Sequence, residues 1–153
     1  MKHPAADSPV YFPVFAGLLL ILLSACGEKG SSSRGSHPLV EDKVAALFTA
    51  LQVEDYDAAL AQYDEGFFKT QSPQAWREKL EALQGESGSL REWHLRRSQA
   101  DARVSGTFFL HEYTSVHTGN KRLHHLMTFL WSVNDEKLLL LGHKITPWQA
   151  GGD

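Results

Sequence analysis

The sequence predicts an α+β domain in which three helices pack on one face of a curved, four-stranded antiparallel meander. Two observations support this fold class. Apolar residues recur at helical spacing up to about residue 88, and runs of β-branched and aromatic residues separated by turn signals follow from Leu90. Helices that all precede the strands are typical of α+β proteins, whose helices gather on one face of an antiparallel sheet.

Three segments before residue 88 carry the helical pattern. The first spans 39–51 and has acidic residues in its opening turn, where the helix dipole favours anions. The second, shorter segment covers 55–63. The third begins with Ser72 as N-cap residue and Pro73 at the first helical position, and two glycines end it.

The second half of the domain reads as four strands joined by short turns. Gly119-Asn120 and Asn134-Asp135 are the turn signals between the last three strands. Because the strands follow one another with short connections, we expect an antiparallel meander. The expected spans are 90–98, 103–117, 121–133 and 138–146.

The turn positions predict a register, and the register predicts which residues share a face. A turn centred on Gly119-Asn120 would pair residue 117 with 122, and a turn on Asp135-Glu136 would pair 133 with 138. A slip of one residue would move every side chain of a strand to the other face. In this register the apolar residues expected under the helices are Val104, Phe108, Leu110, Val116, Leu123, Met127, Phe129, Trp131, Leu138 and Leu140, with Gly142 making room for a ring.

A polar cluster is expected at one end of the same face. An apolar pocket with a few convergent polar groups is the usual form of a ligand site. Glu112 and His125 would be diagonal neighbours, and burial would bring the two pKa values together, so they are the candidate proton-transfer pair. The alternative is a solvated salt-bridge group at a frayed sheet end. The candidate pocket residues are Glu112, Thr114, His125, Met127, Trp131 and Lys144, with Thr146 nearby.

The opposite face is expected to be too apolar for a freely solvated surface. It could pack against the first strand or the tail around Trp148, or it could form an interface with a partner protein or a second copy. His111 and His143 would lie two strands apart, roughly 9–10 Å, which is wide for a shared metal ion, so no metal site or cofactor is expected. The residues expected on this face are Phe109, His111, Tyr113, His124, Leu126, Leu130, Leu139, Leu141 and His143.

The N-terminal segment predicts where in the cell the protein is located. The run 10–23 is apolar over about 14 residues, too short to cross a membrane comfortably but suited to a secretion signal. Small residues then precede Cys26, the only cysteine of the chain. The stretch Leu-Ser-Ala-Cys at 23–26 resembles the lipobox of bacterial lipoproteins. The alternatives are an ordinary cleaved signal with a chance cysteine, or a short membrane anchor.

The lipoprotein resemblance implies a domain organisation. Residues 1–25 would be a cleaved signal peptide, and the Cys26 thiol would carry lipid, with palmitate-type acylation of the new N-terminus. Gly27 rather than Asp after the cysteine points to the outer membrane, facing the periplasm. Segment 26–36, rich in glycine and serine, would be a flexible tether, 37–148 a single domain and 149–153 a disordered tail.

A second resemblance covers most of the remaining chain. The stretches EDYDAALAQYDEGFF, SPQAWREKLEAL and LLLLGHKI resemble the nuclear-transport-factor-2-like superfamily, specifically small secreted bacterial members without assigned activity. The resemblance implies a cone-shaped, cystatin-like architecture. It also implies a cavity between sheet and helices, and dimerisation through the open sheet face.

Together these features predict an anchored binding or protein-interaction module rather than an enzyme. The formal net charge is −3 and the charges are spread along the chain, so no basic face for nucleic acid is expected. The chain also has no GxSxG motif and no glycine-rich phosphate loop. The expected partners are the membrane, through the anchor, and an envelope protein or a second copy. The alternative is a small-molecule-binding protein or an isomerase or hydratase that uses Glu112 and His125.

Overall fold

The computed structural model describes residues 37–149. The lipobox, the tether and residues 150–153 lie outside the described residues, so the predictions made for them stay predictions. Within the described part of the chain, no helix is both long enough and apolar enough to span a membrane. The elements are α1 (Pro38–Gln52), α2 (Tyr56–Leu60), η1 (Phe67–Lys69), α3 (Pro73–Ser87), β1 (Leu90–Arg103), β2 (Gly106–His117), η2 (Thr118–Asn120), β3 (Arg122–Ser132) and β4 (Lys137–Pro147).

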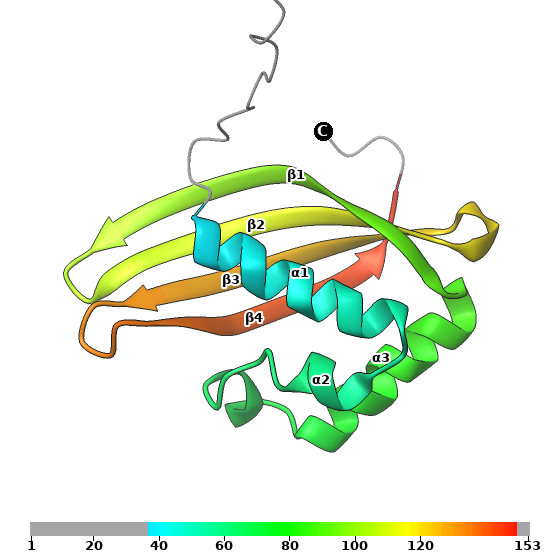
Figure 1. Cartoon of the computed structure of the whole chain (residues 1–153), viewed down its shortest axis with the longest axis horizontal. Coiled ribbons are helices and arrows are strands. Elements are labelled where there is room, and N and C mark those ends of the chain that lie inside the picture. Colours follow the sequence, from blue (N-terminus) through cyan, green and yellow to red (C-terminus); the bar gives the residue numbers. More distant parts are fainter. Residues whose placement is uncertain (1–36, 150–153) are drawn as a thin grey trace, which may run out of the picture. The chain divides into compact units, whose positions relative to one another are not determined.

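The four strands form one antiparallel sheet in the order β1-β2-β3-β4, so the predicted α+β class and meander are confirmed (Figure 1). The strand boundaries differ most at the first hairpin. The sequence predicts a first strand ending at 98 and a second beginning at 103, whereas β1 runs to Arg103 and β2 begins at Gly106. Gly106 has a φ of 144°, a conformation that glycine adopts readily, and it closes this hairpin.

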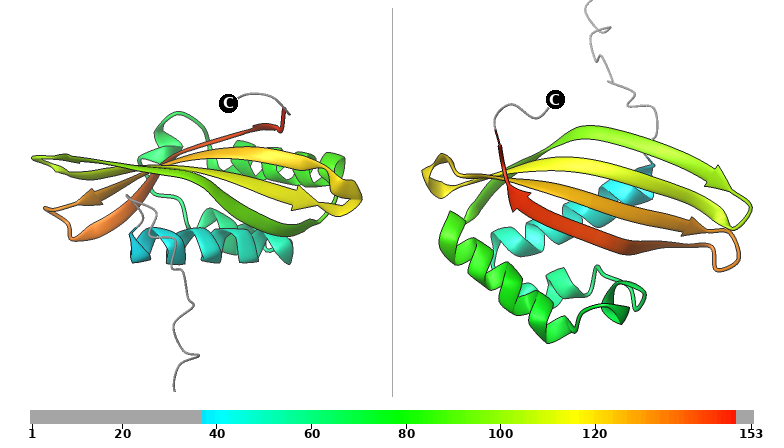
Figure 2. Two further views of the ribbon diagram at one scale, coloured as in Figure 1. Left: turned by 90° about the horizontal axis from the view of Figure 1, so that it is seen from above. Right: turned by 180° about the vertical axis from the view of Figure 1, so that it is seen from behind.

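Helix α1 packs across one face of the sheet, which we call the inner face. Pro38 opens the helix after His37, whose Nδ1 accepts a hydrogen bond from the Leu39 amide at 3.3 Å. The Phe48 ring lies 5.1 Å from that of Trp93 and 5.8 Å from that of Tyr113, which fixes the helix on β1 and β2. Figure 2 shows α1 on one side of the sheet, and the opposite side is the outer face.

The segment from α2 to α3 packs along the β4 side of the sheet. The rings of Tyr63, Phe67 and Trp76 meet there with centroids 4.5–5.8 Å apart. Asp64 joins this segment to β4, because its Oδ2 accepts a hydrogen bond from the Leu140 amide at 2.7 Å. Helix α3 begins at the Ser72 N-cap, whose Oγ accepts from the Ala75 amide at 3.1 Å. These contacts close the core beneath β4.

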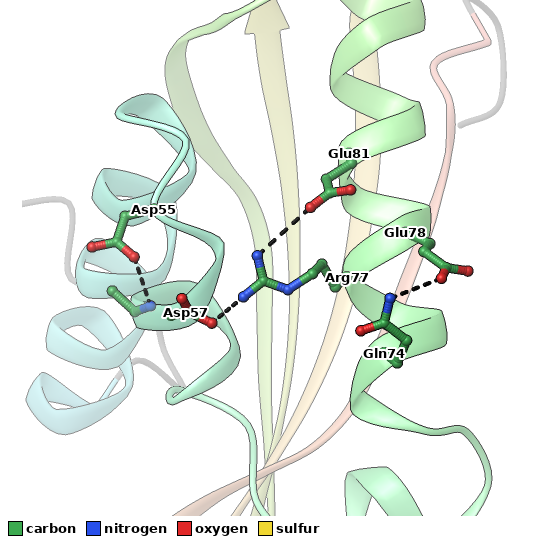
Figure 3. Close-up of polar contacts among 7 residues, drawn as sticks. Asp55, Asp57, Gln74, Arg77, Glu78 and Glu81 are labelled. Atoms are coloured by element: carbon green, nitrogen blue, oxygen red, sulfur yellow. Dashed lines mark hydrogen bonds and ion pairs between the residues drawn. The ribbon is translucent and has the colours of Figure 1, made fainter.

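Arg77 connects α2 to α3 (Figure 3). Its guanidinium pairs with Asp57 of α2 and lies 3.6 Å from Glu81, one turn further along α3. Asp55 caps α2 by accepting a hydrogen bond from the Ala58 amide at 3.0 Å, and it does not contact Arg77 in this group. Because these side chains are at least partly exposed, we expect the ion pairs to orient the two helices more than to stabilise them.

The predicted register between β2 and β3 is wrong by one residue. Tyr113 pairs with His125 and Val116 pairs with Arg122. The reason is the turn: η2 occupies three residues, and the His117 amide donates to the Lys121 carbonyl at 2.8 Å. A loop with an odd residue number reverses the expected parity, so the faces of β2 are exchanged. The inner face therefore carries Phe109, His111, Tyr113, Ser115 and His117, while Phe108, Leu110, Glu112, Thr114 and Val116 lie on the outer face.

The β3–β4 hairpin is also shifted, and a bulge then changes its parity. Phe129 pairs with Leu140 rather than with Gly142, which keeps Leu138 and Leu140 on the inner face as predicted. The register shift between Thr128 and Phe129 then moves Gly142, Lys144 and Thr146 to the outer face. A Cβ at Gly142 would lie 3.3 Å from the Thr128 Cβ, so this glycine makes room for Thr128 and not for a ring.

Candidate functional site

Two groups of polar side chains occupy the two faces of the sheet. One is a chain of hydrogen bonds inside the core of the inner face, and the other lines a pocket on the outer face. We call the first group the buried histidine chain. Its members, in order of contact, are Tyr63, His143, His125, Ser115, His117 and the main-chain carbonyl of Gly88.

The buried histidine chain crosses three strands. The Tyr63 hydroxyl lies 2.7 Å from His143 Nδ1, and His143 Nε2 lies 2.9 Å from His125 Nδ1. His125 Nε2 is in turn 2.8 Å from Ser115 Oγ. The corrected register produces this arrangement, because cross-strand neighbours on β2, β3 and β4 now place their side chains on one face.

The far end of the chain fixes the direction of every hydrogen bond. The Gly88 carbonyl can only accept, so His117 Nδ1, 2.8 Å away, must donate to it. With a neutral ring, His117 Nε2 then accepts from the Ser115 hydroxyl at 2.9 Å. Ser115 therefore accepts from His125, which accepts from His143, and the Tyr63 hydroxyl donates at the other end. One proton arrangement thus satisfies all the hydrogen bonds while every ring is neutral.

Burial keeps two rings of the buried histidine chain, His125 and His143, neutral. His125 is 3% exposed and the Phe48 ring lies edge-on at 5.1 Å. Burial holds the pKa of His125 well below its ordinary value, and the neighbouring histidines lower this pKa further. Burial also lowers the pKa of His143 to about 3, with a smaller contribution from the Lys79 charge. Burial raises the pKa of the Tyr63 phenol.

The structure does not bring the predicted pair Glu112 and His125 together. His125 lies in the packed inner face, with Met127 and Trp131 as same-face neighbours, whereas Glu112 points to the outer face. The hypothesis of a Glu112–His125 proton-transfer site is therefore wrong. Thr114 also lies on the outer face, where its buried hydroxyl has no hydrogen-bond partner among the described residues.

The remaining predicted polar residues do share one end of the sheet, on the outer face. Glu112, Lys144 and Thr146 all lie there, and the histidine that meets them is His124 instead of His125. His124 Nε2 is 3.6 Å from Glu112 Oε2. The polar cluster was thus predicted, but it is on the opposite side from the helices and includes the neighbouring histidine.

A bulge in β1 adds two arginines to this cluster. The register shift between Leu95 and Arg97 leaves Arg96 unpaired in the ladder, and both arginines reach residues of the outer face. The Arg96 guanidinium lies 5.6 Å over the Trp148 ring. Arg97 Nη1 is 4.0 Å from Glu112 Oε1. Sequence reasoning missed these arginines because a bulge leaves no periodic signal.

The outer-face pocket is the hollow that these side chains surround. Its volume is about 670 Å³. The Trp148 amide donates to the Arg122 carbonyl at 3.0 Å, which holds the indole beside His124, with ring centroids 6.3 Å apart. The residues that line the pocket are Arg96, Arg97, Glu112, His124, Thr146, Pro147, Trp148 and Gln149.

The histidines form no metal cluster in the described part of the chain. Across residues 37–149, no three histidine, aspartate, glutamate or cysteine side chains lie close enough together to hold a metal ion. His111 and His143 flank Met127 in one cross-strand row, and His111 Nδ1 lies 3.1 Å from the Tyr113 hydroxyl. The rings of the buried histidine chain instead use both nitrogens in hydrogen bonds.

Comparisons with known proteins give a fold likeness. No protein-family model matches the sequence, and no curated protein matches it either. Among solved structures, Bd1075 of Bdellovibrio bacteriovorus is similar, with a TM-score of 0.50 and 13% identity. The alignment covers 72% of this chain and 40% of Bd1075. At this identity the likeness concerns the fold alone.

Proposed function

We propose that this protein is a lipid-anchored module of the bacterial cell envelope that binds a second copy of itself through the outer face. Three helices on a curved sheet, in the cone-shaped manner of the nuclear-transport-factor-2-like superfamily, are part of the proposal. The observation that carries it is an apolar row on the outer face. Phe108, Leu130 and Leu139 are direct cross-strand neighbours in this row.

The apolar row supports an interface because no helix of the described residues covers it, and the Arg103 guanidinium lies 5.5 Å over the Phe108 ring at one end of the row. Seen from behind, the strands lie in front of α1, and no helix of residues 37–149 crosses the outer face (Figure 2). Leu110 and Leu126 add half-buried apolar side chains to the same face. Contiguous apolar patches on a domain surface mark interaction sites. A twofold axis through the row would place leucine and phenylalanine of one copy against the same residues of the other.

Association should depend on the centre of the row. We expect Leu130→Glu to weaken self-association at least tenfold, because an unpaired carboxylate would be buried against the partner. Native mass spectrometry and light scattering of the full chain in detergent measure the effect. Val53→Glu is the matched control, since Val53 is 70% exposed on the helical side. A complex unchanged by Leu130→Glu, or a parent protein that is monomeric at all concentrations, would overturn the second-copy proposal.

Attachment to the membrane should depend on the sulfur atom of Cys26. We expect Cys26→Ser to abolish labelling by a palmitate analogue and to move the protein from the membrane fraction to the soluble periplasmic fraction. One acyl chain anchors only marginally and two or three anchor stably, so losing the acylated cysteine removes the whole attachment. Ser32→Ala in the tether is the control and should stay with the membranes. A Cys26→Ser protein that still sediments with membranes would show that another segment holds it there.

A further inference from the structure

We propose that the outer-face pocket binds a small molecule through an oxyanion, which is its carboxylate or phosphate group. The proposal goes beyond the self-association proposed for this face, because it names a small-molecule ligand for a separate pocket. It does not depend on self-association through the apolar row. It starts from the bulge in β1, which places two consecutive guanidinium groups on one side of the sheet.

The cations of the pocket exceed its anions. Arg96 and Arg97 contribute two guanidinium groups, and Glu112 is the single carboxylate among the lining residues. His124 adds a further charge when its ring is protonated. This surplus stands out in a chain with a formal net charge of −3. An oxyanion entering the pocket would therefore meet local positive charge and not the average field of the protein.

Glu112 does not saturate the cations beside it. A charge-assisted hydrogen bond between a guanidinium and a carboxylate is about 2.7–2.9 Å long. The 4.0 Å from Arg97 Nη1 to Glu112 Oε1 and the 3.6 Å from His124 Nε2 to Glu112 Oε2 are both longer. The carboxylate is thus shared between two neighbours without a close bond to either. The Gln99 side-chain oxygen, in the amide orientation that satisfies its hydrogen bonds, accepts from Arg97 Nε at 3.1 Å and from Arg97 Nη2. The Arg97 Nη1 group is therefore the donor that remains for a ligand.

Trp148 gives the pocket a fixed wall. Its main chain is bound to Arg122, and its ring lies beneath the Arg96 guanidinium. A cation–π contact at this distance holds the guanidinium near the indole without using its N–H groups in hydrogen bonds, so they can bind a carboxylate or a phosphate. The volume of about 670 Å³ falls within the range of small-molecule sites. The lining therefore combines two oriented cations with one aromatic surface.

The experiment uses the full chain in detergent, with 5-fluorotryptophan replacing the four tryptophans. Trp148→Phe assigns the fluorine signal of residue 148. Inorganic phosphate and benzoate are titrated at constant ionic strength, with benzyl alcohol as the neutral probe. We expect at least one of the two anions to shift the Trp148 signal saturably in the millimolar range or below, with the other three tryptophan signals unmoved. Which anion binds more tightly identifies phosphate or carboxylate as the preferred group.

Substitutions then test the two arginines. Arg96→Gln and Arg97→Gln should each weaken anion binding at least tenfold, and because both side chains are exposed the fold should persist. Arg91→Gln, an exposed arginine outside the pocket lining, is the matched control and should bind as the parent does. Three results would each overturn the proposal. They are an unmoved Trp148 signal, anion binding by Arg96→Gln and Arg97→Gln that equals binding by the parent protein, and a response to benzyl alcohol that equals the response to the anions. Loss of self-association in Leu130→Glu with anion binding intact would separate the two proposals.

Discussion

Lowering the pH from 7 to 5 should destabilise the domain by about 4 kcal/mol, since both His125 and His143 are held neutral in the core. Above about pH 7.5 these histidines are neutral in both the folded and the unfolded chain, so they give no pH dependence. As the pH falls through about 6.5, the unfolded chain binds one proton on each of the two histidines, whereas both rings stay neutral in the folded core. Each contributes about 1.4 kcal/mol of lost stability per pH unit.

The loss continues until the folded protein itself takes up the protons, which for His143 requires a pH near its lowered pKa of about 3. A histidine cation in the chain would also disrupt the hydrogen bonds, because a protonated ring donates from both nitrogens and cannot accept from its neighbour. With a typical domain stability of about 5–15 kcal/mol, the protein should still be folded at pH 5 but with a much smaller free energy of unfolding.

Urea unfolding between pH 5 and 8 measures this effect, and a matched variant isolates its source. His143→Gln removes one of the two histidines that are protonated in the unfolded chain only. The slope of the unfolding free energy against pH should therefore fall by about half between pH 5 and 6.5. His94→Gln is the control because His94 is an exposed side chain on β1, and its slope should equal that of the parent. Equal slopes in the parent and His143→Gln would contradict a neutral buried ring at this position.

The fold class could be predicted from the sequence because it depends only on the spacing at which apolar residues recur. Apolar residues at helical spacing followed by alternating strands define an α+β meander whatever the exact turns are. The register could not be predicted, because it depends on loop geometry. Gly119 and Asn120 have φ values of 83° and 61°, which suits a two-residue turn, yet the loop takes three residues.

The candidate site was predicted in part for the same reason. The polar residues at the sheet end gather as expected, since all of them lie at one end whichever face they occupy. The parity of one turn and one bulge then decides the face, and exchanges His125 for His124 as the partner of Glu112. The buried histidine chain could not be predicted from the sequence, because histidine is intermediate in burial and its hydrogen-bond partners depend on the register of the strands.

Ser115→Ala should lower the free energy of unfolding by about 2–6 kcal/mol, more than removal of the Tyr63 hydroxyl, which is the other hydroxyl in the buried histidine chain. Ser115 is fully buried and is the only member that both donates to one histidine and accepts from another. Removing its Oγ leaves the His125 N–H and the His117 acceptor without partners. Each buried polar group left unsatisfied costs about 1–3 kcal/mol.

Tyr63→Phe provides the comparison at the end of the chain. It deletes one donor and leaves one acceptor, His143 Nδ1, so its cost should be about half that of Ser115→Ala. Ser105→Ala in the exposed β1–β2 turn controls for the effect of the substitution itself and should change the unfolding free energy by less than about 0.5 kcal/mol. If Ser115→Ala lowered the unfolding free energy no more than Ser105→Ala does, the buried histidine chain would not contribute to stability. A full cost would show that the stability of the inner face depends on continuous hydrogen bonding through three histidine rings.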